Sequence, residues 1–149
     1  VGTSIPFGPQ LYSLVSNMPL LTGANLSSSG APRVGTTIAF NIIDQTNPGN
    51  MYVLLMSLTN SGIPLGDGRI IPLGFDPLLL LAIQYPLSVG LQNNVMNLNP
   101  QGRGQATWSI PNIPELAGLR VYAAFVVVNP SAPSGIGSIS NGLPITLQP

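Results

Sequence analysis

The sequence lacks cysteine, histidine and lysine, and charged residues make up only 5% of its 149 residues. Without cysteine the chain has no disulfide framework, so its apolar core has to hold the fold. Four arginines balance four acidic residues, and the net charge is zero. Because nothing supplies a basic field, we expect no nucleic acid and no anionic membrane surface among its partners.

The same shortages remove most enzymatic chemistry. Ser-His and Cys-His pairs and Schiff-base lysines are excluded, because the side chains that form them are missing. Asp67 and Asp76 remain as an acid and base pair of the glycosidase kind, which requires a separation of about 5 to 9.5 Å. Asp67-Gly68 and Asp76-Pro77, however, are common turn dipeptides. The sequence therefore predicts no enzyme, no catalytic residue and no cofactor.

A metal site is also not expected. Calcium needs about six to eight oxygen ligands, and Asp44, Asp67 and Asp76 do not belong to any spaced Asp/Asn motif that would supply them. No apolar run approaches the roughly 18 residues of a membrane-spanning helix, so we expect no membrane insertion. Zero net charge combined with 44% hydrophobic residues favours association of the chain with copies of itself.

The sequence is rich in short apolar runs, which 17 glycines and 16 prolines separate. The most strongly patterned run is Leu119–Val128, in which apolar side chains fall on both sides of an extended strand. A strand that is apolar on both sides is normally covered on both. We therefore expect a central strand here, with the rest of the chain arranged over its two faces.

The other runs predict further strands. They cover residues 35–42, Tyr52–Leu58, Arg69–Leu73, 105–110 and 143–147, while Pro77–Tyr85 fits either a helix or a strand. About eight short strands and no helix of convincing length predict an all-β fold, an antiparallel β-sandwich or jelly roll. Trp108 falls on the inward face of its strand, which favours a core role over a sugar-stacking platform.

The first 29 residues differ from the rest, and we expect an N-terminal arm and linker over 1–29 and a β-sandwich domain over 30–149. Prolines in the arm favour an edge position, either in its own sheet or added to a neighbour's sheet. The residues expected to contact the neighbour are Ile5, Phe7, Leu11, Tyr12, Leu14 and Val15. Residues 17–32 are rich in turn formers and predict a linker or surface loop. Asn25-Leu26-Ser27 in that loop is a glycosylation sequon, which marks Asn25 for modification.

From residue 30 onward the chain resembles a small β-sandwich domain that recurs in uncharacterised exported proteins of environmental bacteria. The segments that carry the resemblance are residues 30–37, 52–57, 104–119, 128–130 and 140–147. The resemblance implies a sandwich fold and a secreted or cell-surface location, and the family has no catalytic motif to carry over. Val1 in place of methionine is compatible with the removal of a leader.

Two functions fit these expectations. The first is a structural subunit of an extracellular filament or surface assembly, which self-associates when the arm of one copy adds as a strand to the next copy. The unusual absence of lysine favours it, because charged side chains normally block sheet edges against pairing. The alternative is a carbohydrate-binding or accessory module of a larger exported protein, in which exposed aromatic side chains contact glycans.

Overall fold

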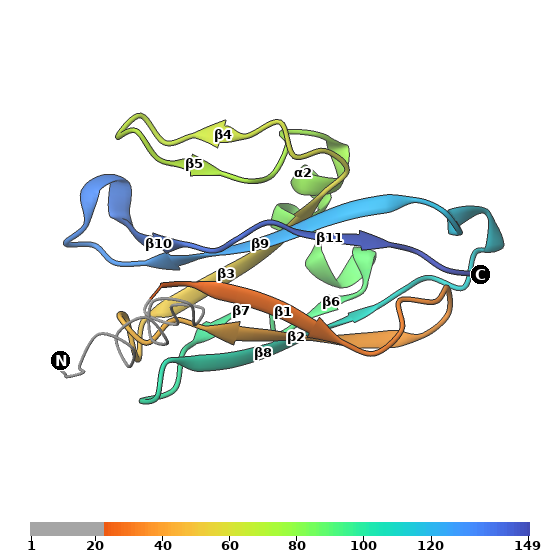
Figure 1. Ribbon diagram of the computed structural model, residues 1–149, viewed down its shortest axis with the longest axis horizontal. Coiled ribbons are helices and arrows are strands. Elements are labelled where there is room, and N and C mark those ends of the chain that lie inside the picture. The colour runs from red at the N-terminus through yellow and green to blue at the C-terminus, as the bar shows by residue number, and fades with distance from the viewer. Residues whose placement is uncertain (1–22) are drawn as a thin grey trace, which may run out of the picture.

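The computed structural model describes residues 23–149, here called the body. The six residues expected to contact a neighbouring subunit lie outside the described residues, so their role stays a prediction. Strand is the predominant regular structure of the body, and the strands pair in antiparallel sheets (Figure 1). The prediction of an all-β fold is confirmed at this level. No helix of the body is long and apolar enough to cross a membrane.

The first sheet has four strands in the order β1-β2-β8-β6. They are β1 (Asn25–Ser29), β2 (Thr37–Ile43), β8 (Arg103–Ser109) and β6 (Leu91–Gln92). Their register places Leu26 opposite Ile42 and Ile38 opposite Trp108, so one face of the sheet is apolar. The loop predicted over residues 17–32 is wrong for residues 25–29. The small polar side chains of β1 hid a strand that has only one apolar residue, Leu26, to bury.

The second sheet is built around β9 (Arg120–Val128), which pairs with β3 (Met51–Ser57) on one side. On its other side β9 pairs with two short strands, β10 (Ile136–Ile139) near its end and β11 (Leu143–Thr146) near its start. β7 (Val95–Asn97) completes the sheet beyond β3. The central position predicted for this strand is confirmed.

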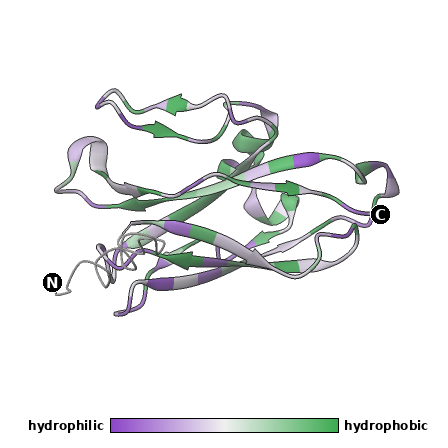
Figure 2. Ribbon diagram, in the orientation of Figure 1, coloured by the Kyte–Doolittle hydropathy of each residue, from purple (hydrophilic) through white to green (hydrophobic). Residues whose placement is uncertain are grey.

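The two sheets enclose the main core. β2 contributes Phe40 and Ile42, β3 contributes Leu54, and β9 contributes Phe125, all with no exposed surface. Trp108 on β8 belongs to the same core, as its inward position in the sequence predicts. Apolar residues follow β3 and β9 along much of their length (Figure 2). Burial of one such side chain contributes about 1.5–3 kcal/mol to folding.

The outer face of the second sheet has its own cover. The β4–β5 hairpin (Ile63–Pro64 and Ile70–Ile71) and α2 (Pro77–Gln84) lie on the side of this sheet away from β1, β2 and β8 (Figure 1). A second cluster joins Leu73 and Leu79 to Ala124 of β9. The body itself therefore covers both faces of β9.

The run Pro77–Tyr85, which the sequence left open, is a helix over Pro77–Gln84. Asp76 begins it as N-cap, because its side chain accepts a hydrogen bond from the backbone N–H of Leu79, and Pro77 fits the first turn. Three short 3-10 turns complete the body: η1 (Pro86–Val89), η2 (Pro114–Leu116) and η3 (Pro133–Gly135).

Candidate interaction site

The two long sides of the body are finished differently. On one side the chain itself crosses from β6 in the first sheet to β7 in the second. The Tyr52 hydroxyl spans the sheets there, since it lies within 2.8 Å of the Asn93 carbonyl oxygen and 3.2 Å of that of Gln105. Burial raises the pKa of this phenol, which keeps it in the neutral form that donates a hydrogen bond. We call this the closed side.

On the other side no strand of residues 23–149 crosses, and β1 at the edge of the first sheet meets β10 and β11 at the edge of the second. We call this line the seam. Asn141, between β10 and β11, bridges it with its side-chain carboxamide. Its Oδ1 accepts a hydrogen bond from the Leu26 N–H at 2.7 Å, and its Nδ2 donates one to the Leu26 carbonyl at 3.1 Å. A single side chain thus makes the two hydrogen bonds that a residue of a paired strand would make.

Near the start of β9 the seam is closed by backbone groups. The N–H of Gln148 donates to the Pro32 carbonyl, and the N–H of Val34 donates to the Gln148 carbonyl, both at 2.9 Å. Pro144 in β11 has no N–H to offer to an additional strand. Strand addition is therefore blocked at this end.

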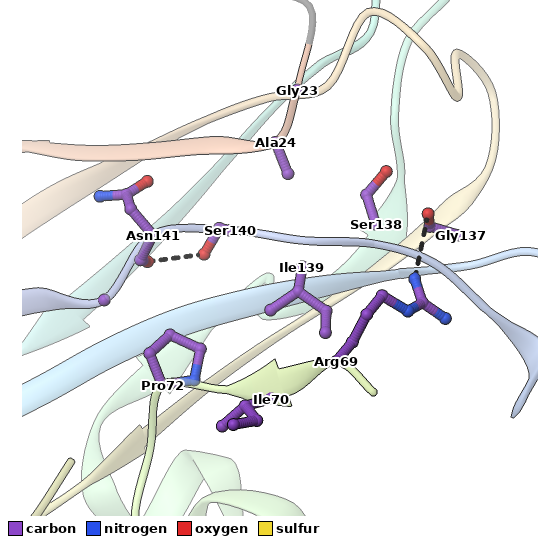
Figure 3. A pocket seen from close by; sticks show the side chains of 11 residues that line it. Gly23, Ala24, Arg69, Ile70, Pro72, Gly137, Ser138, Ile139, Ser140 and Asn141 are labelled. Atoms are coloured by element: carbon purple, nitrogen blue, oxygen red, sulfur yellow. Dashed lines mark hydrogen bonds between the residues drawn. The ribbon is translucent and has the colours of Figure 1, made fainter. Parts of the chain in front are cut away.

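At the opposite end the seam opens into a pocket of about 610 Å³. Figure 3 shows three segments around it: Gly23 and Ala24 just before β1, the β5 region from Arg69 to Pro72, and residues 137–142. Ile70 is 60% exposed at its edge. The chain that precedes the body joins it here, because Gly23 is itself part of the lining.

Backbone groups that point away from their own sheets lie along the seam beside this pocket. Hydrogen bonding along the edge of an antiparallel strand alternates between inward and outward residues. Leu26 points outward, toward Asn141, so Ser28 in β1 points outward as well, farther along the seam from the pocket. Directly after β10 the N–H of Ser140 bonds the Phe125 carbonyl of β9, which turns the backbone groups of Ile139, the last residue of β10, away from β9. The alternation thus directs some donors and acceptors of both edges away from their own sheets.

One charged side chain covers part of the β10 edge. A β-bulge between Ile136 and Ser138 turns backbone carbonyls of β10 outward. Arg69 donates to the carbonyls of Pro133, Ile136 and Gly137 at 3.1, 2.7 and 3.4 Å. Asp67 holds this guanidinium through an ion pair of 2.8 Å. The side-chain and backbone hydrogen bonds from Arg69 lower the pKa of Asp67, which keeps the pair charged.

The three aspartates of the sequence analysis have separate structural partners. Asp67 binds Arg69, and Asp76 accepts hydrogen bonds from the backbone N–H groups of Leu58 and Thr59 besides capping α2. Asp44 has no exposed surface, and its carboxylate accepts from Thr46 and Asn47. The described residues contain no group of three potential metal ligands.

Two further candidates have different outcomes. Trp108 is 4% exposed, and its indole N–H donates to the Val89 carbonyl at 2.8 Å, so it offers no face to a sugar. Asn25 is the first, half-buried residue of β1, paired with Ile43, so the loop expected around this sequon is wrong. The sequence does not indicate the roles of Asn141 and Arg69, because the residues that they contact lie up to 115 positions away.

Comparison with known protein families and with curated proteins finds no match. Among solved structures, the chain is similar to a crystal structure of a DUF4466 family protein from Parabacteroides merdae, with a TM-score of 0.32 and 16% sequence identity. The similarity covers 83% of this chain and 44% of that chain, so this chain spans less than half of the other protein's length. The expected resemblance to exported bacterial proteins stays a prediction.

Proposed function

We propose that the protein is a structural subunit of an extracellular filament or surface assembly. In this assembly residues 1–16 of one copy add as a strand to the seam of a neighbouring β-sandwich. The single observation that carries the proposal is the seam itself, where outward backbone groups of β1 and β10 flank a pocket of about 610 Å³. Main-chain hydrogen bonds to such an edge are the usual source of affinity in strand addition.

The chemistry of the seam fits the N-terminal segment. Residues 1–22 contain no charged residue, so nothing in them opposes burial against a neutral edge. Ile70, Pro72 and Ile139 give the pocket apolar surface for alternate side chains of an added strand, such as Ile5 and Phe7. Arg69 and Pro144 close other parts of the edge, which would restrict pairing to the stretch between Ala24 and Asn141.

The extracellular location in this proposal rests on the resemblance of residues 30–147 to exported domains. A carbohydrate-binding or accessory module is the other function considered. Trp108 lies in the core, so it is not part of an exposed aromatic platform that could contact a glycan. Among the aromatic side chains of the body, Tyr85 is 60% exposed and Phe75 is 74% exposed. They lie beside α2, and we do not assign them a glycan.

The test compares the full chain with a variant that lacks residues 1–16, by size-exclusion chromatography with light scattering and by negative-stain microscopy. We expect the full chain to form oligomers or filaments and the shortened chain to be a folded monomer. A synthetic peptide of residues 1–16 should then bind the shortened chain, and a scrambled peptide of the same composition should not. Filaments that persist without residues 1–16, or a full chain that stays monomeric, would contradict the proposal.

A further inference from the structure

A second pocket, of about 340 Å³, lies at the end of the two sheets away from Gly23. It reaches into the core between them, where Met56, Trp108 and Val121 line it and are nearly inaccessible. Leu58, Leu81 and Leu119 form its rim and are 39%, 44% and 38% exposed. We call it the apolar pocket.

The lining of the apolar pocket is almost wholly apolar and includes no charged residue. Ser88 contributes a side-chain hydroxyl group to the lining. The indole N–H of Trp108 is already bonded to the Val89 carbonyl, so it does not seek a ligand. A charged ligand would lose its hydration without compensation in such a site.

A peptide is also a poor occupant of the apolar pocket. Each residue of an extended chain brings one N–H and one C=O, and burying such a group without a partner costs about 1–3 kcal/mol. The lining offers little with which to satisfy them. The volume, by contrast, lies at the lower end of the range of small-molecule sites, which is about 300–1,000 Å³.

We propose that the apolar pocket binds a small, uncharged, mainly hydrocarbon or aromatic molecule with at most one polar group, which Ser88 would bind. This inference does not depend on the proposed assembly, because the pocket and the seam have no lining residue in common. The helix α2 and the turn η1 supply one wall, and the ends of β3, β8 and β9 supply the others.

The test uses the neutral fluorescent probe N-phenyl-1-naphthylamine and the full chain. Trp108, the single tryptophan, lines the pocket and serves as energy-transfer donor to a bound probe. We expect saturable binding with energy transfer from Trp108. The variant Leu81→Arg places a charge at the rim and should weaken binding at least about tenfold. Leu81 is exposed enough for the variant to fold, which circular dichroism checks.

The matched control is Leu80→Arg, since Leu80 lies on the same helix and is 42% exposed but does not line the pocket. It should leave binding unchanged. Equal losses in the two variants would assign the probe to the exposed surface of α2 and overturn the proposal, as would an absence of saturable binding. Binding that appears only after removal of residues 1–16 would identify that segment as the occupant and overturn it as well.

Discussion

The closed side and the seam differ in how the edges of the two sheets are joined. Both are places where the edges of two sheets meet, and unpaired edges invite association with other chains. On the closed side the covalent chain passes from β6 to β7, and the buried Tyr52 hydroxyl lies within hydrogen-bonding distance of the carbonyl oxygens of Asn93 in the crossing and Gln105 in β8. On the seam the two edges are joined by the side chain of Asn141 and, near the start of β9, by backbone hydrogen bonds of Gln148.

This difference has a consequence for where the body can open. A covalent crossing can be separated only by unfolding the strands on both sides of it. The carboxamide of Asn141, by contrast, leaves Leu26 when one side chain rotates, and Asn141 is exposed to solvent. The seam is therefore the side on which another strand can exchange with the groups that now cover the edge.

The largest effect is expected on the closed side, from Gly90→Ala. Gly90 ends η1 with φ 94°, a left-handed conformation that is strained for alanine. A Cβ atom there would also overlap the Ser109 carbonyl oxygen of β8. This oxygen belongs to the backbone of a paired strand, so it cannot move aside without distorting the sheet. We expect the free energy of unfolding to fall by about 3 kcal/mol or more, measured by urea denaturation.

Gly49→Ala is the matched control for this substitution. Gly49 has φ 79°, but nothing lies within 4 Å of the position that its Cβ would take. The control therefore carries the backbone strain alone, about 1 kcal/mol. Equal losses in the two variants would mean that the β6–β8 contact is loose, and the contrast between the closed side and the seam would then fail.

A smaller effect is expected on the seam, from Asn141→Ala. The substitution removes the partners of the Leu26 N–H and C=O and should lower the free energy of unfolding by about 1–2 kcal/mol. If the proposed assembly is right, the freed edge should also bind the peptide of residues 1–16 more tightly. Urea denaturation and a peptide titration of the chain lacking residues 1–16 measure the two effects.

Asn60→Ala, in an exposed turn, serves as control for Asn141→Ala and should change neither quantity. Unchanged stability in Asn141→Ala would show that water replaces the carboxamide at no cost, so that the seam is already open in solution. Weaker peptide binding would instead make Asn141 part of the binding site and not a substitute for the added strand.

The sequence carries the signals that depend on neighbours in the chain. The alternating apolar pattern of Leu119–Val128 predicts a strand buried on both faces, and the inward position of Trp108 follows from the same period. Asp76-Pro77 is an N-cap followed by a first helical residue, which in retrospect distinguishes α2 from a strand. Periodicity alone did not, because leucine fills the run on every side.

The seam could not be predicted in this way. Nothing in residues 136–142 indicates that Asn141 reaches Leu26, since this contact exists only once two sheets have packed. The sequence predicts a loop in place of β1 because Ser27, Ser28 and Ser29 are exposed at an edge and need no apolar partner. The part of the body where interaction is proposed is therefore the part with the weakest sequence pattern.

The smallest effect concerns the ion pair of Asp67 and Arg69 beside the β10 edge, and the size of this effect depends on pH. Hydrogen bonds from Arg69 lower the pKa of Asp67 in the folded protein, so the pair stabilises the fold when Asp67 is ionised. That contribution is fully present above the unfolded-state pKa of about 3.9 and is lost as the pH falls through the lowered folded-state pKa.

The difference in urea midpoint between the wild type and Asp67→Asn should thus be widest near neutral pH and narrow below about pH 4. It should also shrink in high salt, because the pair lies at the surface. A difference that does not change with pH would mean that Arg69 stays on the carbonyls of Pro133 and Ile136 without its carboxylate, and that this stretch of the seam is closed as firmly as the other side.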